Sequence, residues 1–394
     1  MRVTRRAFLG GAVSAAGLAG IAGKEAIAAP QPQPYVAFAT LGVCGPFTGD
    51  HTKLGEQIAN GVRQACDDAN LIRGTLDRAY QLRTFDDGDL LASGIVTAGF
   101  ACDDPSVVCV IGHLNGHITE QAAKIYANRG MPLIVPASTF DRITEDGLPN
   151  VVRLPTKDFT EGRLCGKYVS TTWKPSRVAV AYQDGDYGYD VANGFSQQMD
   201  ADKIALTTVQ FSFDKPQFSQ VAAKALQPKP DAVFLPGNVE DMGLLLRELR
   251  DAGFAGRIMA SQGFFKSDTL SKYATYLDKT MASTPLPPLE LAPSVFRVRT
   301  SFQQRYGPGS FTYLAAFGYA AAQVAISALG RSGSNDRLSL LRQLQLPAPY
   351  QTAVGTYQFL PSGDAVQPNI YFYSVRDGRF RYETSAVPTT FLAR

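Results

Sequence analysis

The stretch VIGHLNGHIT, Val110 to Thr119, decides the fold because it joins a strand pattern to a helix pattern through a glycine turn. It begins within the apolar run SVVCVIG, which is typical of a buried strand and ends at Gly112. From Ile118 the spacing becomes helical, with apolar side chains at Ile118, Ala122 and Ile125. The stretch therefore predicts one strand–turn–helix unit.

The same unit repeats along the chain. Strand and helix patterns alternate over residues 35–138, and the alternation restarts after Asp158. The predicted strands are 35–42, 80–87, 106–112 and 131–138 in the first series, and 177–183, 231–237 and 257–263 in the second. Repeated βα units of this length predict an α/β fold with two parallel, doubly wound sheets and helices on both faces.

Three later segments break this alternation. The run STPLPPLELAP, residues 283–293, has four prolines, which excludes regular structure and predicts a crossover between two lobes. Residues 313–330 are apolar almost all round and predict a buried helix. In the tail, residues 355–364 and 371–382 predict strands around turns at Pro361-Ser362-Gly363 and Asp377-Gly378.

The N-terminus has the pattern of a twin-arginine export signal. Arg5 and Arg6 precede an apolar, glycine-rich run that ends in small residues at 26–28, which predicts cleavage after Ala28. A transmembrane anchor is the weaker reading, because the run is too short for a bilayer about 30 Å thick. We find no other segment of about 18 apolar residues, so we expect a soluble, periplasmic protein.

Removal of 28 of the 394 residues leaves 366, which suits two lobes better than one core. The signal carries a net charge of +3, so the mature chain is close to neutral. No dense run of Lys or Arg remains, which argues against nucleic acid or an anionic membrane as partner. The five cysteines are an odd number in no zinc-type spacing, and their pairing stays open.

Two motifs suggest metals, and both fail on spacing. His113 and His117 could share an ion only if the glycine-flanked turn between them were helical, and no third ligand is near in sequence. The acidic run DGDYGYD, residues 184–190, would need Gly and Glu where Tyr189 and Phe195 stand to form a calcium loop. We therefore expect no metal and no cofactor.

The chain resembles the branched-chain amino-acid-binding proteins of ABC importers, which are type I periplasmic binding proteins. The similarity runs in order from about Tyr35 to Phe380. It is carried by GPFTGDHTKLGEQIANGVRQACDDAN, VIGHLNGHITEQAAKIYANRGMPLIVPAST, DGDYGYD and GLLLRELRDAGFAGRIMASQGFF. The resemblance implies two Rossmann-like lobes joined by a three-strand hinge, which close on a small ligand for delivery to a membrane permease.

The resemblance also implies the lobe boundaries. Residues 35–157 with 285–352 would form the N-terminal lobe, and 158–284 with 353–394 the C-terminal lobe. We expect a monomer or weak dimer whose partners are a small-molecule ligand and an ABC permease.

Ligands of open α/β sheets bind beyond the carboxyl ends of the strands. The resemblance places ligand contacts there at Gly116, where the family often has Ser, at the Ala137 carbonyl, and at Thr139, with Ser138 between the last two. Thr139 would bind α-carboxylate and ammonium groups, and Tyr187 would stack over the ligand from the second lobe. The residues from Ser138 to Asp141 could also simply cap the next helix.

The chain departs from the family at several site positions. Leu54 and Asn238 stand where the family has aromatic residues, and Gln262 stands where an acid pairs with the ligand's ammonium. Gly88 and Asn115 occupy the positions of a family disulfide. The nearby carboxylates that could replace this missing acid are those of Asp184, Asp186 and Asp241. We therefore expect a small carboxylate, amide or other polar ligand without an α-ammonium group.

The leading prediction is a periplasmic solute-binding protein without catalytic activity. A ligand sensor for a membrane or regulatory partner is an alternative that the sequence does not separate from transport. An exported enzyme is weaker, because the chain has no GxGxxG after the first strand, no GxSxG and no CxxCH.

Overall fold

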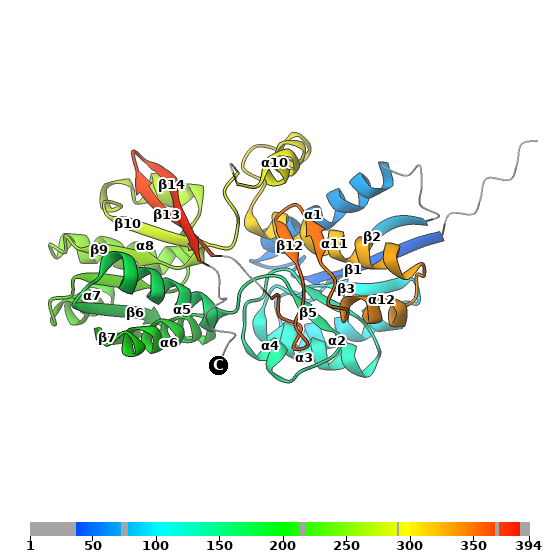
Figure 1. Ribbon diagram of the computed structural model, residues 1–394, viewed down its shortest axis with the longest axis horizontal. Helices are drawn as coiled ribbons and strands as arrows, with labels where there is room; N and C mark the ends of the chain where they lie inside the picture. The colour runs from blue at the N-terminus through cyan, green and yellow to red at the C-terminus, as the bar shows by residue number, and fades with distance from the viewer. Residues whose placement is uncertain (1–36, 72–77, 213–216, 290, 367–369, 387–394) are drawn as a thin grey trace, which may run out of the picture. The chain divides into compact units, whose positions relative to one another are not determined.

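A computed structural model describes residues 37–71, 78–212, 217–289, 291–366 and 370–386 (Figure 1). The predicted signal peptide, residues 1–28, lies outside these described residues. Within them the chain forms two large sheets and one small hairpin. The α/β class expected from the alternating pattern is confirmed.

The first sheet has five parallel strands in the order β2-β1-β3-β4-β5. These are β1 (Ala37–Gly45), β2 (Arg78–Asp86), β3 (Val107–Ile111), β4 (Leu133–Val135) and β5 (Val151–Arg153). The helices associated with this sheet are α1 (Thr52–Leu71), α2 (Leu91–Asp103), α3 (Gly116–Asn128), α4 (Arg142–Glu145), α10 (Pro293–Tyr306), α11 (Tyr313–Ser332) and α12 (Arg337–Leu344).

The two faces of the first sheet carry different cores. Leu41 and Val43 of β1 pack in the cluster that contains α1 and α11, whereas Cys44 packs in the cluster that contains α2 and α3. This alternation follows from the two-residue period of a strand. It covers both faces of the sheet and leaves the strand ends for other contacts.

The second sheet has seven strands in the order β14-β13-β10-β9-β8-β6-β7. The strands are β6 (Arg177–Gln183), β7 (Ala205–Phe211), β8 (Ala232–Leu235), β9 (Arg257–Ala260), β10 (Thr280–Thr284), β13 (Ile370–Arg376) and β14 (Arg379–Ala386). The helical segments are α5 (Asp158–Tyr168), η1 (Val169–Trp173), α6 (Asp186–Ala201), α7 (Phe218–Leu226), α8 (Val239–Asp251), η2 (Gln262–Phe264), α9 (Ser267–Lys272) and η3 (Ala274–Tyr276).

The tail adds an antiparallel hairpin to the second sheet, at the turn predicted from Asp377-Gly378. β13 is antiparallel to β10 and to β14, because the turn at Asp377-Gly378 returns the chain along the same edge. Figure 1 shows this hairpin in red beside β10. The remaining strands of the second sheet are parallel, as expected from their βα units.

The proline-rich run is shorter than predicted. Ser283 and Thr284 belong to β10, and Pro293 starts α10, where proline is tolerated at the first helical position. The run therefore leads from the second sheet to helices that pack on the first sheet. The sequence pattern overestimated it because proline excludes strands and helices only locally.

The chain returns through the hairpin of β11 (Tyr350–Thr352) and β12 (Gly355–Tyr357). Phe359 and Ala365 still pack in the first-sheet core, and β13 of the second sheet begins at Ile370. We therefore propose that the third crossover follows Ala365, rather than Thr352 as the sequence analysis placed it. The other lobe boundaries remain predictions.

Helix α11 corrects one expectation from the sequence. Among the described residues, α11 is the one helix that is both long enough and apolar enough to cross a membrane. The sequence analysis had found no such segment after the export signal. Its side chains from Leu314 to Leu329 are largely buried in the first-sheet core, beside α1. Core helices of this kind satisfy the same length and composition test as membrane spans.

Candidate functional site

A series of buried, hydrogen-bonded side chains fixes the turn after β3. His113 is fully buried, with Nδ1 2.7 Å from Oδ2 of Asp87 and Nε2 3.0 Å from the hydroxyl of Tyr126. That hydroxyl donates to Sγ of Cys44 at 3.3 Å. His113 is therefore a structural residue that fixes the turn.

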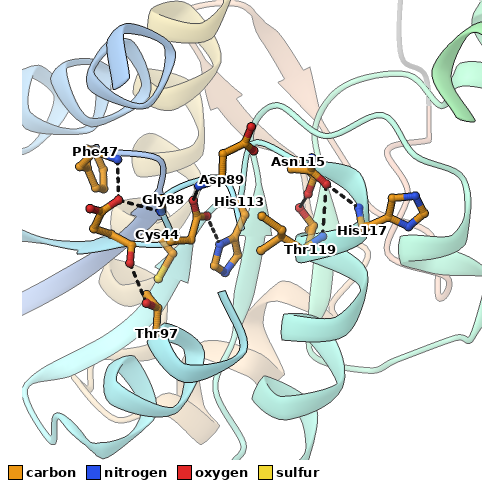
Figure 2. A network of polar contacts seen from close by, with 12 residues as sticks. Cys44, Phe47, Gly88, Asp89, Thr97, His113, Asn115, His117 and Thr119 are labelled. Carbon is orange, nitrogen blue, oxygen red and sulfur yellow. Dashed lines mark hydrogen bonds and ion pairs between the residues drawn. The ribbon is translucent and has the colours of Figure 1, made fainter. Parts of the chain in front are cut away.

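His117 lies on the other side of the same turn. Its ring is 5.0 Å from that of Phe140 and its side chain is exposed. Figure 2 shows the His113 and His117 side chains pointing in different directions. Because both ring nitrogens of His113 already have partners within the protein, the two histidines do not form a shared metal site.

Helix α3 begins with its own cap. Oδ1 of Asn115 accepts the backbone N–H groups of His117 at 3.0 Å and Ile118 at 3.4 Å, as Figure 2 shows. Gly116 follows directly, and a Cβ atom there would lie 2.6 Å from Cβ of Phe140. A serine like that of the family would not fit at Gly116 unless Phe140 moved.

One open pocket contains most of the predicted site residues. Its volume is about 1360 Å³, including the part open to solvent. It is lined by residues that follow β3 and β4 in the first sheet and β6, β8 and β9 in the second. The predicted residues among them are Gly116, Ala137, Ser138, Thr139, Tyr187, Asn238 and Gln262.

Leu54 was also predicted as a site residue, but it is not among the described residues that line the pocket. Its partly buried side chain packs against the first-sheet core instead. The alternative role of Thr139 as a helix cap is also not seen among the described residues. Asp141 is the N-cap of α4 and makes no side-chain cap bond, whereas the Thr139 carbonyl accepts the N–H of Asp158 at 3.1 Å.

The second-sheet side of the pocket is tied by side-chain hydrogen bonds. Asn238 caps α8 by accepting the N–H of Asp241 at 2.9 Å, and its amide donates to Oδ2 of Asp241 at 2.9 Å and to Gln183 at 3.2 Å. Gln183 also donates to Asp241 at 2.5 Å. The carboxylate of Asp241 is thus bound by two neighbours.

Several lining residues were not predicted as site residues. Tyr313 opens α11, Lys266 follows η2, Gln183 ends β6, and Asp158 opens α5. Gln183 could have been found, since it stands at the end of the strand predicted at 177–183. Tyr313 and Asp158 start helices after crossovers, where the strand-end rule does not apply.

Carboxyl groups gather at one edge of the pocket. Oxygens of Asp141, Asp158 and Asp190 lie within 4.8 Å of one another, the only such group of potential metal ligands among the described residues. Burial raises the pKa of Asp158 well above its ordinary value, and the charges of Glu161 and Asp141 raise it further while Thr139 lowers it. Burial likewise raises the pKa of Asp141.

The five cysteines form no disulfide in the described part of the chain. All five lie in the described part of the chain, and there each is buried and free. Burial raises the pKa of Cys44 and of Cys66 to about 12, which keeps both as unreactive thiols. They act as small core residues.

Comparison with known proteins gives a consistent group. The sequence model of a family described as "Periplasmic binding protein" matches residues 39–379. The "Leu/Ile/Val-binding protein homolog 2" of Brucella abortus (strain 2308) is 26% identical over 346 residues, covering 87% of this chain and 92% of the relative.

Two solved structures share the fold. One is a leucine binding protein LivK from Thermotoga maritima, with a TM-score of 0.78 and 22% identity over 89% of this chain and 99% of that one. The other is a solute binding protein of an ABC transporter from R. palustris in complex with benzoate, with a TM-score of 0.75 and 18% identity over 89% of this chain and 96% of that one.

Proposed function

Since the chain belongs to the periplasmic binding protein family, in its branched-chain amino-acid-binding group, we propose that it is the solute-binding protein of an ABC importer. It captures a small polar organic molecule in the pocket described above. The molecule is amino-acid-like, an amide or a carboxylate. The family and the structural neighbours are solute-binding proteins, so the proposed activity is binding without catalysis.

One observation carries the proposal. Loops from two separate sheets converge on a single pocket, and seven of the eight predicted site residues line it. The pocket is open to solvent, and the part that compares with small-molecule sites of about 300–1000 Å³ has a volume of about 510 Å³. A pocket that is open to solvent would enclose a small ligand only after its two sides approach, which supports closure about the crossovers.

The export signal and the family support the rest of the proposal. The protein is exported through the twin-arginine pathway to the periplasm, binds its ligand as a monomer or weak dimer, and delivers it to an inner-membrane permease.

Native mass spectrometry of protein purified without refolding tests this function. We expect one retained small molecule per chain, which is released on mild unfolding. Wild-type protein that retains no small molecule, and that no amino acid, amide or carboxylate stabilises in a thermal-shift screen, would contradict the proposal.

A further inference from the structure

Helix α2 carries a group of large apolar side chains on its exposed side. Among the described residues, twelve large apolar side chains are exposed, and five of them lie between residues 90 and 100. These are Leu90, Leu91, Ile95, Val96 and Phe100, with exposed fractions of 62%, 46%, 43%, 54% and 62%. Single exposed apolar side chains are ordinary, whereas a contiguous group of them marks an interaction site.

The helical period brings these side chains together. Leu91 and Ile95 are four residues apart, as are Val96 and Phe100, so the two pairs form adjacent rows on the surface of α2. Leu90 precedes the first turn. We call these five residues the α2 face. Figure 1 shows α2 on the side of the first sheet opposite α1 and α11.

The other side of α2 has small residues. Gly94, Ala98, Ala101 and Cys102 are buried, and the last three pack in the same cluster as α3. A Cβ atom at Gly94 would lie 2.3 Å from Cγ2 of Ile118 on α3, so the two helices pack too closely for a larger side chain there. The large apolar residues of α2 therefore occupy the side that a surface helix normally fills with polar residues.

The α2 face carries no charge. The only charged residue of α2 is Asp103 at its end, and the carboxylate of Asp103 pairs with Arg129. On the other side Asp89 precedes the face, with Oδ2 2.5 Å from Nδ1 of His51. The carboxylates that flank the face in sequence therefore already have partners within the same chain.

A neutral, apolar face suits a second copy of the same chain. A two-fold interface is formed by the same surface of both subunits, so a charge at its centre would meet a like charge. The α2 face avoids that repulsion. A membrane surface fits less well, because helices that lie on membranes have Lys or Arg on their polar side, and α2 has neither.

The size of the face fits a weak dimer. Residues of this size have about 150–250 Å² of accessible surface, so the five exposed fractions amount to about 500 Å² per chain. Two such faces would bury about 1000 Å², which is near the lower limit for a specific interface. We therefore expect a dissociation constant on the order of 1–100 µM.

We propose that the α2 face is a two-fold dimer interface, in which α2 of one protomer packs against α2 of its partner. The inference goes beyond the proposed function, because none of the five residues is among the described residues that line the pocket. Helix α2 packs only in the core of the first sheet, as far as the described residues show. A dimer formed through α2 therefore leaves the second lobe free to move when the pocket closes.

Sedimentation-velocity ultracentrifugation of the mature protein tests the proposal. Wild-type protein should shift from monomer to dimer between about 1 µM and about 300 µM. Phe100→Glu places a charge on the face and should weaken dimerisation at least about 30-fold. Phe296→Glu on α10 is the matched control, because Phe296 is 55% exposed and lies outside the face. The control should dimerise as wild type does, and both variants should keep the wild-type circular dichroism spectrum.

Cross-linking locates the contact. The five native cysteines are buried, so a cysteine introduced at the surface is the accessible thiol. Val96→Cys lies in the middle of the face and should give a covalent dimer with a short bismaleimide. Phe296→Cys should stay monomeric under the same conditions.

Three outcomes would overturn the inference. Wild-type protein that stays monomeric at the highest concentration has no such interface. Equal dimerisation of Phe100→Glu and Phe296→Glu would place the interface elsewhere on the molecule. If the protein instead cosediments with vesicles of phosphatidylethanolamine and phosphatidylglycerol, and Phe100→Glu abolishes this, the face binds a membrane surface. Ligand retention is measured separately by native mass spectrometry, so failure of the dimer leaves the proposed function standing.

Discussion

The hydroxyl of Tyr187 on α6 donates a hydrogen bond to Oγ of Ser261 at 2.9 Å, and the same Oγ accepts the backbone N–H of Gly237 at 3.2 Å. Three segments of the second sheet are joined at this point, and Tyr187 and Gly237 also line the pocket. The tyrosine ring is thus held in one orientation at the pocket wall.

Replacement of Tyr187 or Thr139 by Ala should weaken ligand binding by about 1–3 kcal/mol, the typical cost of a lost hydrogen bond in a buried setting. The two residues come from opposite sides of the pocket. Tyr187→Phe keeps the ring and should lose less than Tyr187→Ala. Calorimetry with the retained ligand measures the effect, and wild-type affinity in both alanine variants would show that the pocket is misassigned.

Gly116→Ser should destabilise the fold by about 1–3 kcal/mol and reduce binding, because the new side chain overlaps Phe140. Gly99→Ala on α2 is the control, since a Cβ atom there has no neighbour within 4 Å. That change should be neutral or stabilising by up to about 1 kcal/mol. Urea unfolding compares the two, and a fully stable Gly116→Ser variant would exclude the close contact.

Glu161 should make the ligand-free protein less stable as pH rises. Burial raises its pKa to about 7 from the ordinary 4.5, so the folded state binds more protons than the unfolded state between these values. Stability present at low pH is therefore lost as pH rises towards 7. Glu161→Gln should remove this slope and stabilise the protein at pH 8 by on the order of 2–4 kcal/mol. An unchanged slope in urea unfolding at pH 5, 6, 7 and 8 would refute the assignment.

Two histidine–aspartate pairs near the first sheet offer an internal comparison. The His113–Asp87 pair is fully buried, whereas His51 pairs with Asp89 at 2.5 Å with its own side chain 53% exposed. His113→Ala should cost about 3–5 kcal/mol, because it leaves Asp87 buried without its partner. His51→Ala should cost about 1 kcal/mol or less. Equal losses in thermal or urea unfolding would mean that the buried chain does not stabilise the turn.

The periodic elements could be predicted from the sequence, and the family was confirmed. Each of the seven strands predicted in the two series corresponds to an observed strand, although β4 and β9 are shorter than their apolar runs. The sequence analysis did not predict two strands of the second sheet. These are β7, whose side chains range from buried to exposed, and β10, which ends in the proline-rich run. Such strands depend on neighbours far away in sequence rather than on their own pattern.

The candidate site was predictable where it follows strand ends. Asp158 and Glu161 were missed because acids in the first turn of a helix are common and usually need no ligand to explain them. Glu161 interacts with Tyr187, Ser283 and Tyr313, which come from three other elements. No pattern of neighbouring residues in the sequence predicts that these side chains lie close together.

Closure of the two lobes on a ligand is the central claim, and small-angle X-ray scattering tests it most directly. The mature protein should be measured without ligand and with a saturating amount of the compound that native mass spectrometry identifies. We predict a fall in the radius of gyration with ligand and none in a Thr139→Ala/Tyr187→Ala double variant. An unchanged scattering profile of the wild-type protein at saturation would contradict the account.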